Sequence, residues 1–567
     1  MNDKLLNTIA ARDVKVGGLI GRRIELTWQN NLLAINWERD FLAPFLAKNS
    51  DAGAYIGLGK SLDGLVRLAA HTGDGRLLAR RQQVLDTLLP AQEADGYLGI
   101  YRPADRAIPT WDAHEQAYVL MALVVDWQLF RQERSLASAQ RLGRWLVSRI
   151  PSTALHLVGK RTWQGQVSFL SRQLVLTGLD RALLALYRAT GEPSLLDYCV
   201  ETLRVAEWDQ PIVEGRFGPI EGHVYCFLSH CLAQLDLFEI TGDRRLLAQT
   251  RRALEYLRDG RALVISGTNG ITECWHSDQT GTGDIGETCS VAYLIRLLSH
   301  QLQIEGDGWY GDWMERSIYN ALFAAQSPDG RRLSYYVPLE GERHYWDRDT
   351  YCCPGNFRRI IGELPEMIAY RQADGVMVNL YTESDITTAL ANGTPLVLRQ
   401  HTDYPHSGQV RLDVEPARPA RFAVRLRRPA WCTEFVVAVN GETVSPIGGP
   451  HFLAISSEWR PGDRVTLAMP MPWRLVRGFR KQVGKVAAMR GPQLFCRATP
   501  SDSATEFRAD DIAANLSLME FPDPGGRATY FACADSPLMT DDELFPQGIG
   551  LSQGLRRSDS EGEDHRH

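Results

Sequence analysis

The sequence lacks the features of three classes of protein. Its 62 basic and 68 acidic residues give a net charge of −6 with no basic stripe, which argues against nucleic acid as a partner. No run approaches the roughly 18 apolar residues of a membrane-spanning helix, so no membrane partner is expected. The N-terminal segment M-N-D-K-L-L-N-T-I-A-A-R-D has no apolar signal-peptide core, and we therefore expect a cytoplasmic protein.

A disulfide framework is also not expected. The chain has ten cysteines in 567 residues, and in a reducing compartment these are expected to be thiols or ligands. Six of them lie among apolar neighbours and are expected to be buried small hydrophobes: Cys199, Cys226, Cys231, Cys432, Cys496 and Cys533. The sequence leaves the role of Cys274 open.

The first two thirds of the chain predicts paired helices. A length of 567 residues exceeds one ordinary core, and a short phrase recurs after apolar helical stretches. Its copies are H-T-G-D-G-R-L-L at 71–78, A-T-G-E-P-S-L-L at 189–196 and I-T-G-D-R-R-L-L at 240–247, with a degenerate copy at 131–137. Glycine ends each helix in the left-handed conformation. A spacing of about 50 to 60 residues is that of a helical hairpin repeat.

The sequence predicts three regions along the chain. Roughly six helix pairs can close a ring, so we expect an (α/α)6 toroid as the catalytic domain over 1–372. Short β-rich runs separated by turn residues predict a β-sandwich over 373–550, with V-N-G-E at 439–442 as a hairpin turn. The polar residues 551–567 are expected to be a disordered tail.

Two distant segments together offer a ligand set for zinc. Cys352 and Cys353 are adjacent in T-Y-C-C-P-G-N, and Cys289 lies 63 positions before Cys352 in G-E-T-C-S, two residues after Glu287. Adjacent cysteines rarely form a disulfide, whereas three thiols and a carboxylate are a full tetrahedral set for Zn²⁺. Taken alone, Glu287 could instead cap a helix and Cys289 could belong to the core.

These motifs resemble those of the β-L-arabinofuranosidases of glycoside hydrolase family 127. The resemblance rests on Glu-X-Cys before a helix, the downstream Cys-Cys-Pro, and the order of toroid and sandwich. It extends over most of the chain through stretches such as D-W-M-E-R-S-I-Y-N-A-L at 312–322, S-Y-Y-V-P-L-E at 334–340 and R-G-P-Q-L at 490–494.

The resemblance implies a role for each motif residue. Cys352 would be the nucleophile, and Glu287, Cys289, Cys352 and Cys353 would hold zinc. Glu273 would be the general acid/base; it lies fourteen positions before Glu287, two fewer than the family spacing. In this chemistry a metal keeps the thiol deprotonated, and the carboxyl group protonates the leaving oxygen and then deprotonates water.

Three further residues are candidates for sugar binding. His223, in E-G-H-V-Y, matches a family position that faces the sugar, although a structural histidine at a helix start fits equally well. Tyr336 precedes the cysteine turn and could contact sugar or belong to the core. His276, with Asp278 and Asp284, lies between Glu273 and Glu287 and could serve the site or be ordinary loop polarity.

The sugar-binding wall departs from the family. The helix containing His114 has Ala117 where the family has a histidine, and Leu179 replaces a second one. Our leading hypothesis is a retaining hydrolase releasing L-arabinofuranose from small oligosaccharides or glycoconjugates. A related exo-glycosidase for another rare pentose or deoxy sugar stays open, as does a non-catalytic carbohydrate-binding protein with structural zinc, because closed four-ligand sites are typical of structural zinc. A homodimer also stays open.

Overall fold

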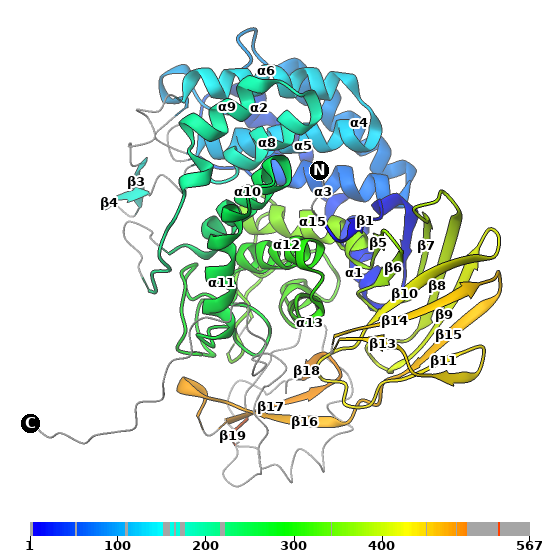
Figure 1. The fold of residues 1–567 in the computed structure, drawn as a ribbon. Helices are drawn as coiled ribbons and strands as arrows, with labels where there is room; N and C mark the ends of the chain where they lie inside the picture. The colour runs from blue at the N-terminus through cyan, green and yellow to red at the C-terminus, as the bar shows by residue number, and fades with distance from the viewer. Residues whose placement is uncertain are drawn as a thin grey trace, which may run out of the picture.

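The computed structural model of the chain has a helical region followed by a β-rich region (Figure 1). It describes residues 4–50, 54–107, 111–150, 159–163, 166–170, 176–215, 222–341, 343–449, 451–483, 485–495 and 531–532. The predicted disordered tail at 551–567, and Cys496 and Cys533, lie outside these ranges.

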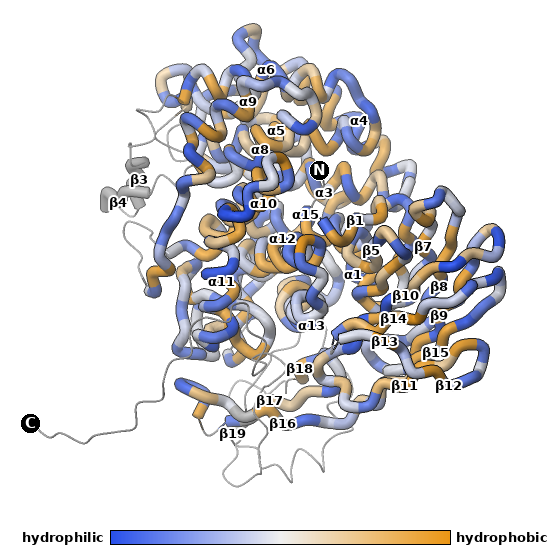
Figure 2. The backbone as a smooth tube through the Cα atoms, in the orientation of Figure 1, coloured by the Kyte–Doolittle hydropathy of each residue, from blue (hydrophilic) through white to orange (hydrophobic). Residues whose placement is uncertain are grey.

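Six inner helices form a closed ring in the helical region. They are α3 (Leu58–Thr72), α5 (Asp112–Phe130), α8 (Leu179–Thr190), α10 (Val224–Thr241), α12 (Thr288–Glu305) and α15 (Cys352–Glu363). Each packs on the next in chain order, and α15 packs on α3. Hydrophobic residues are numerous along α5 and α12, two of the ring helices (Figure 2). Burial on all sides explains why these helices are apolar over most of their circumference.

Outer helices alternate with the inner ones along the chain. They are α1 (Gly18–Leu26), α4 (Gly75–Leu88), α6 (Glu133–Arg149), α9 (Pro193–Asp197), α11 (Ala248–Arg258) and α13 (Gly308–Ser317). Each of the last five packs on the inner helix that precedes it, and α1 contacts α15. The arrangement confirms the α/α toroid that the repeated phrase predicted.

The repeated phrase acts as a pair of helix caps. Gly73, Gly191 and Gly242 end α3, α8 and α10 with φ values of 64°, 70° and 73°, a conformation that costs glycine little. The next residue caps the following helix in two copies, since Asp74 and Asp243 each accept a backbone N–H two residues later. The phrase thus turns the chain between inner and outer helices.

The β region contains two large sheets. The first has the order β1 (Asn7–Thr8), β5 (Ala369–Gln372), β6 (Gly375–Val378), β10 (Ala420–Arg427), β14 (Phe452–Trp459) and β13 (Ile447–Gly448). The second has the order β12 (Glu442–Val444), β11 (Val436–Val439), β15 (Asp463–Ala468), β9 (Gln409–Pro416), β8 (Pro395–Thr402), β7 (Ser384–Ala389) and β2 (Val14–Val16). Buried residues of both belong to one core. The predicted hairpin joins β11 to β12, with Asn440 and Gly441 at positive φ.

Smaller β elements complete the region. A third sheet contains β16 (Trp473–Arg477), β17 (Lys485–Arg490), β18 (Gln493–Phe495) and β19 (Phe531–Ala532), and its buried residues pack against the segment 264–285 of the toroid. A separate hairpin joins β3 (Gly159–Trp163) to β4 (Gln166–Leu170).

The toroid and the sheets are joined by pairings the sequence did not reveal. The N-terminal strands β1 and β2 pair with β5 and β7, more than 360 positions later in the chain. Arg427, with no exposed side chain, pairs with Glu315 of α13 at 2.6 Å, and the Tyr404 hydroxyl donates to the same carboxylate. A buried ion pair with this many partners ties the two regions together.

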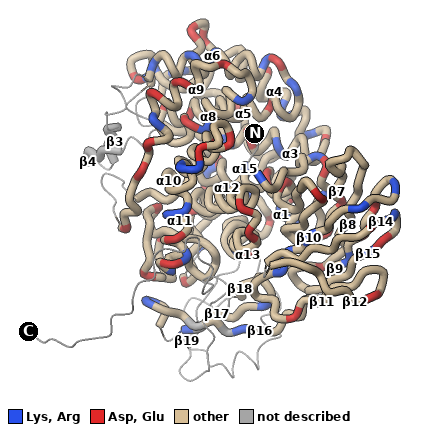
Figure 3. Tube along the Cα trace, viewed as in Figure 1, with Lys and Arg blue, Asp and Glu red and all other residues tan. Residues whose placement is uncertain are grey.

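Residues of both charges are distributed along the described chain. Lys and Arg alternate with Asp and Glu along both regions without a stripe of one sign (Figure 3). Among the described residues no helix has both the length and the apolarity needed to span a membrane.

Candidate metal-thiolate active site

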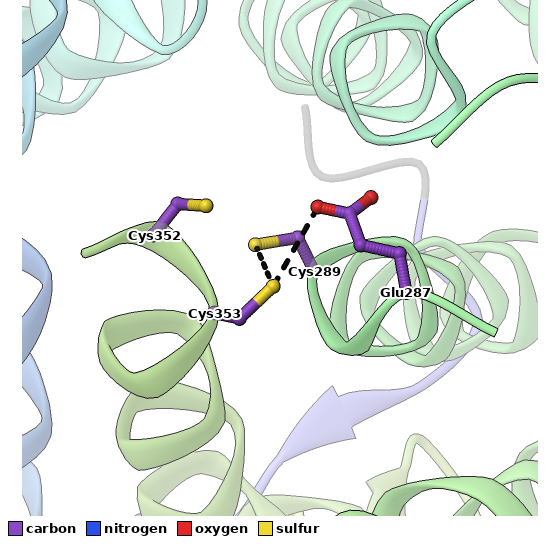
Figure 4. Close-up of side chains that lie close together, drawn as sticks. All are labelled: Glu287, Cys289, Cys352 and Cys353. Atoms are coloured by element: carbon purple, nitrogen blue, oxygen red, sulfur yellow. Dashed lines mark hydrogen bonds between the residues drawn. The ribbon is translucent and has the colours of Figure 1, made fainter. Parts of the chain in front are cut away.

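The four predicted metal ligands converge at the N-termini of two neighbouring inner helices. Glu287 and Cys289 lie at the start of α12, and Cys352 and Cys353 are the first residues of α15. One ligand atom from each lies within 4.8 Å of every other. Their side chains face a common point (Figure 4). The Cys289 and Cys353 sulfurs are 3.3 Å apart, and Cys353 Sγ lies 3.6 Å from Glu287 Oε1.

Local backbone contacts explain how each helix presents its ligands. Glu287 occupies the N-cap of α12, and the next residue, Thr288, donates its backbone N–H to the Tyr335 carbonyl. Tyr351, at the N-cap of α15, has φ 102°, an uncommon value for a residue with a side chain. Its N–H donates to the Ile56 carbonyl, so the strained turn is fixed by the segment before α3.

A buried carboxylate anchors that segment in turn. Glu115 of α5 accepts the backbone N–H groups of Ile56, Gly57 and Leu58 at 2.7–3.0 Å. It therefore caps α3 from a neighbouring helix, and it is fully buried. Gly57 is required here, because a Cβ would lie 2.8 Å from the Tyr351 carbonyl oxygen. The position of Cys352 and Cys353 at the start of α15 is thus fixed by contacts with α5 and with the segment that begins α3.

The cluster has the properties of a cation site. Burial, and next the charge of Glu273, raise the pKa of Glu287 to about 8, and burial raises the pKa of Cys289 and Cys353 well above the usual thiol value. Glu287 Oε2 is buried without a hydrogen-bond partner among the described residues. A buried carboxyl group and neighbouring thiols can all be ionised at the same time only when a bound cation compensates their negative charges. Three sulfurs and one carboxylate oxygen are the donor set that zinc prefers.

Cys352 differs from the other two thiols. It is partly exposed, whereas Cys289 and Cys353 are buried. Burial works against ionisation, but hydrogen bonds from Cys289 and Cys353, the charge of Lys60 and the Tyr335 hydroxyl lower the pKa of Cys352 well below the usual value. Reactive thiolates are typically found in such electropositive, partly accessible surroundings.

Glu273 lies beside this cluster in a strained bend. Its φ is 69°, and its carbonyl accepts the N–H of Val224 at the start of α10. One carboxylate oxygen accepts from the Tyr335 hydroxyl at 2.5 Å, and the other lies 3.4 Å from His223 Nε2. Glu273 keeps 17% of its side chain exposed, while His223 is buried. Two side chains therefore orient a carboxyl group that substrate can reach.

The Tyr335 hydroxyl lies between Glu273 and Cys352, the two predicted reactive residues. Tyr335 was not among the residues predicted from the sequence. Besides its bond to Glu273, its hydroxyl lies 3.4 Å from Cys352 Sγ. Burial, followed by the charges of Cys352 and Glu273, raises the pKa of Tyr335 well above its usual value, so the phenol keeps its proton. Tyr336 lies next to it with its ring centroid 4.8 Å away. Of the two, Tyr335 is the one whose hydroxyl is hydrogen-bonded to Glu273 and lies close to Cys352.

The remaining candidates lie farther along the same loop. His276 pairs with Asp278 at 2.9 Å, and Asp278 also pairs with Lys481 of the β region. Asp284 is exposed, and its carbonyl accepts the N–H of Thr272. Cys274 is buried, and burial raises the pKa of its thiol to about 11. These residues lie in the loop around Glu273, and none of them belongs to the group of ligand atoms formed by Glu287, Cys289, Cys352 and Cys353.

A set of buried side chains around Lys60 of α3 lies beside the thiol cluster. Lys60 Nζ lies 3.0 Å from His114 Nε2 and over the rings of Tyr118 and Tyr225, at 4.3 and 5.0 Å. Ala117 and Leu179, where the family has histidines, are both buried. The expected burial of Cys199, Cys226, Cys231 and Cys432 is confirmed.

Known proteins with a similar sequence or fold point to one family. Residues 36–366 match the family described as "Beta-L-arabinofuranosidase, GH127 catalytic domain", and residues 375–471 match "Beta-L-arabinofuranosidase, GH127 middle domain". A non-reducing end β-L-arabinofuranosidase of Bifidobacterium longum subsp. longum is 24% identical, over 80% of this chain and 79% of that protein.

Solved structures agree on the fold. A family 127 β-L-arabinofuranosidase from Geobacillus stearothermophilus T6 has a TM-score of 0.71 at 24% identity, covering 88% of this chain and 89% of that one. A second family 127 β-arabinofuranosidase has a TM-score of 0.72 at 22% identity, covering 88% and 86%. Since the catalytic-domain match alone spans more than half of the sequence, this chain belongs to the family 127 β-L-arabinofuranosidases and is a glycoside hydrolase.

Proposed function

We propose that this hydrolase retains anomeric configuration, with Cys352 as its nucleophile and Glu273 as its acid/base. The observation that carries the proposal is the Tyr335 hydroxyl, which contacts both groups at 3.4 and 2.5 Å. These two contacts limit the distance between sulfur and carboxylate oxygen to about 6 Å. Retaining glycosidases keep their two reactive groups about 5–5.5 Å apart, whereas inverting ones need about 6.5–9.5 Å to admit a water.

Glu287, Cys289, Cys352 and Cys353 would hold a zinc ion. The orphaned Glu287 oxygen and the sulfur-rich donor set support this assignment. Bound zinc would stabilise the thiolate form of the cluster at neutral pH and so keep the sulfur a good leaving group.

The residues then divide the reaction into two steps. Cys352 Sγ attacks the anomeric carbon while Glu273 gives its proton to the departing glycosidic oxygen, which leaves a thioglycoside on Cys352. Glu273, now a carboxylate, takes a proton from water as the water attacks the same carbon and the C–S bond breaks. Tyr335 and His223 hold the carboxylate in place through both steps.

The proposed substrate is a β-L-arabinofuranoside at the non-reducing end of a small oligosaccharide or glycoconjugate. The similar enzyme of Bifidobacterium longum is named for that activity. Tyr336 and His276 remain candidate sugar contacts. A different rare pentose or deoxy sugar is the second candidate, because the wall beside His114 has Ala117 and Leu179 instead of histidines. The cytoplasmic location and the oligomeric state stay predictions.

A substrate panel with stereochemical analysis tests the proposal. Zinc-replete protein is assayed with aryl α- and β-furanosides and pyranosides, and the first-formed sugar is followed by proton NMR. We expect hydrolysis of the β-L-arabinofuranoside with β-arabinose formed first. Cys352→Ser should abolish turnover but bind substrate, with Cys432→Ser, a buried cysteine of the β region, as the matched control. First formation of the inverted anomer, or full turnover by Cys352→Ser, would refute the mechanism, and hydrolysis of another furanoside or pyranoside in place of the β-L-arabinofuranoside would refute the proposed substrate.

A further inference from the structure

The toroid has a cavity at the opposite end of its axis from the thiol cluster. It has a volume of about 400 Å³ and is lined by residues from the later halves of inner helices, such as Gln128 of α5, Gln303 of α12 and Glu363 of α15, together with Asp63 of α3 and Arg181 of α8 from earlier positions. The thiol ligands lie at the beginnings of α12 and α15. Arg296 and Arg359 each lie seven residues after a ligand, which is about 10 Å along a helix.

A layer of tyrosines separates this distal cavity from the catalytic site. The Tyr118 hydroxyl contacts the hydroxyls of Tyr225 and Tyr293, so α5, α10 and α12 are bonded across the axis. On the distal side, Arg359 donates to the Tyr293 hydroxyl at 3.2 Å. The distal cavity is therefore a separate space with its own lining.

The distal cavity is lined by six cationic side chains and four carboxylates. The cations are Lys4, Arg67, Arg181, Arg188, Arg296 and Arg359. Most of them are already paired. Arg67 and Arg359 bond to Asp63, and Arg181 and Arg188 bond to Asp236. Lys4 and Arg188 also pair with Glu239 behind the wall. The net charge of the cavity lining is therefore modest, and one guanidinium differs from the rest.

That guanidinium belongs to Arg296. Its Nε donates to Glu363 at 2.7 Å, which fixes the plane of the side chain. Nη1 and Nη2 have no hydrogen-bond partner among the described residues, although only 4% of the residue is exposed. The ring of Tyr293 lies 4.8 Å from its central carbon. A buried charged donor without acceptors is costly, and the free edge of a guanidinium matches a carboxylate or phosphate in geometry.

We propose that the distal cavity binds a small organic anion whose phosphate or carboxylate accepts hydrogen bonds from Arg296 Nη1 and Nη2. The volume is that of a small-molecule pocket and exceeds what an inorganic ion fills. Arg188, whose side chain is 35% exposed, marks a side from which solvent reaches the cavity. The site is independent of the catalytic assignment, since the tyrosine layer stands between them.

Thermal shift and calorimetry test the proposal on the zinc-loaded full chain. The probes are inorganic phosphate, a pentose 5-phosphate and citrate, each against sodium chloride of equal ionic strength. We expect at least one organic anion to raise the Tm in a saturable manner and to bind more tightly than inorganic phosphate. The pentose phosphate and citrate arms distinguish a phosphate ligand from a carboxylate one.

Matched variants locate the binding. Arg296→Gln should weaken binding by about tenfold or more, whereas Arg81→Gln, which removes a buried paired arginine that does not line the cavity, should leave it unchanged. If Arg296→Gln does not fold, Arg188→Gln at the exposed side should still weaken binding severalfold. The proposal is overturned if none of the three probes gives saturable binding, or if anion binding persists unchanged in the Arg296 or Arg188 variant.

Discussion

Replacing Tyr335 with phenylalanine tests the arrangement of the reactive residues. The change removes one hydroxyl and with it the contacts to Glu273 at 2.5 Å and to Cys352 at 3.4 Å. A hydrogen bond to a charged group contributes about 1.5–3 kcal/mol, and each 1.36 kcal/mol is tenfold in rate. We therefore expect kcat/KM to fall by about 10- to 150-fold, with the fold intact.

The assay is initial-rate hydrolysis of an aryl β-L-arabinofuranoside, with Tm measured in parallel. Tyr319→Phe is the control, since its hydroxyl is buried without a hydrogen-bond partner among the described residues and lies near the β region. It should change kcat/KM by less than about twofold. An equal effect of the two substitutions, or none for Tyr335→Phe, would refute the bridging role of this phenol.

Three further predictions concern the metal, the interface and acid stability. Cys289→Ala should purify without stoichiometric zinc by elemental mass spectrometry and with a lower Tm, whereas Cys274→Ala, outside the ligand set, should keep its zinc; equal zinc in both would contradict the site. Glu315→Gln removes one of the two carboxylates that pair with the buried Arg427, the other being Asp312, and should cost about 1.5–3 kcal/mol of unfolding free energy in urea, while the exposed Glu458→Gln should cost little; similar urea midpoints for the two variants would contradict a stabilising role of this contact. Burial opposes ionisation of Asp63, but Arg67 and Arg359 hold its pKa at about 2, below an unfolded value of about 3.9. Its stabilisation is therefore present above about pH 4 and lost as pH falls toward 2, so Asp63→Asn should flatten the decline of Tm over that window; a decline as steep as in the unmodified chain would contradict this.

Local rules made much of the fold predictable. The repeated phrase marks where inner helices end and outer helices begin. Its glycine accepts a positive φ, and the aspartate that follows in two copies caps the next helix. The position of Glu287 and Cys289 at the start of a helix was predictable from short-range chemistry, whereas Cys352 and Cys353 were expected before a Pro-Gly turn and instead begin the helix α15. The Asn440–Gly441 turn was also predictable from short-range chemistry.

Features that depend on distant partners were not predictable. Strands β1 and β2 are too short to be recognised without the sheets they join. Tyr335 and Tyr336 are identical in chemistry, and which one bonds to Glu273 depends on the path of the irregular segment after α14 (Phe323–Ala325). Arg296 lies in an apolar helix without any local sign that its guanidinium would face a cavity. In each case packing, rather than propensity, decides the outcome.

The identity of the nucleophile is tested most directly by trapping the glycosyl-enzyme. Zinc-loaded protein is treated with a cysteine-directed L-arabinofuranosyl inactivator, digested, and sequenced by tandem mass spectrometry, which separates Cys352 from the adjacent Cys353. We expect one sugar adduct per chain on Cys352, formed as activity is lost and prevented by L-arabinose. An adduct on Cys353 or Glu273, or full inactivation with Cys352 unmodified, would contradict the account.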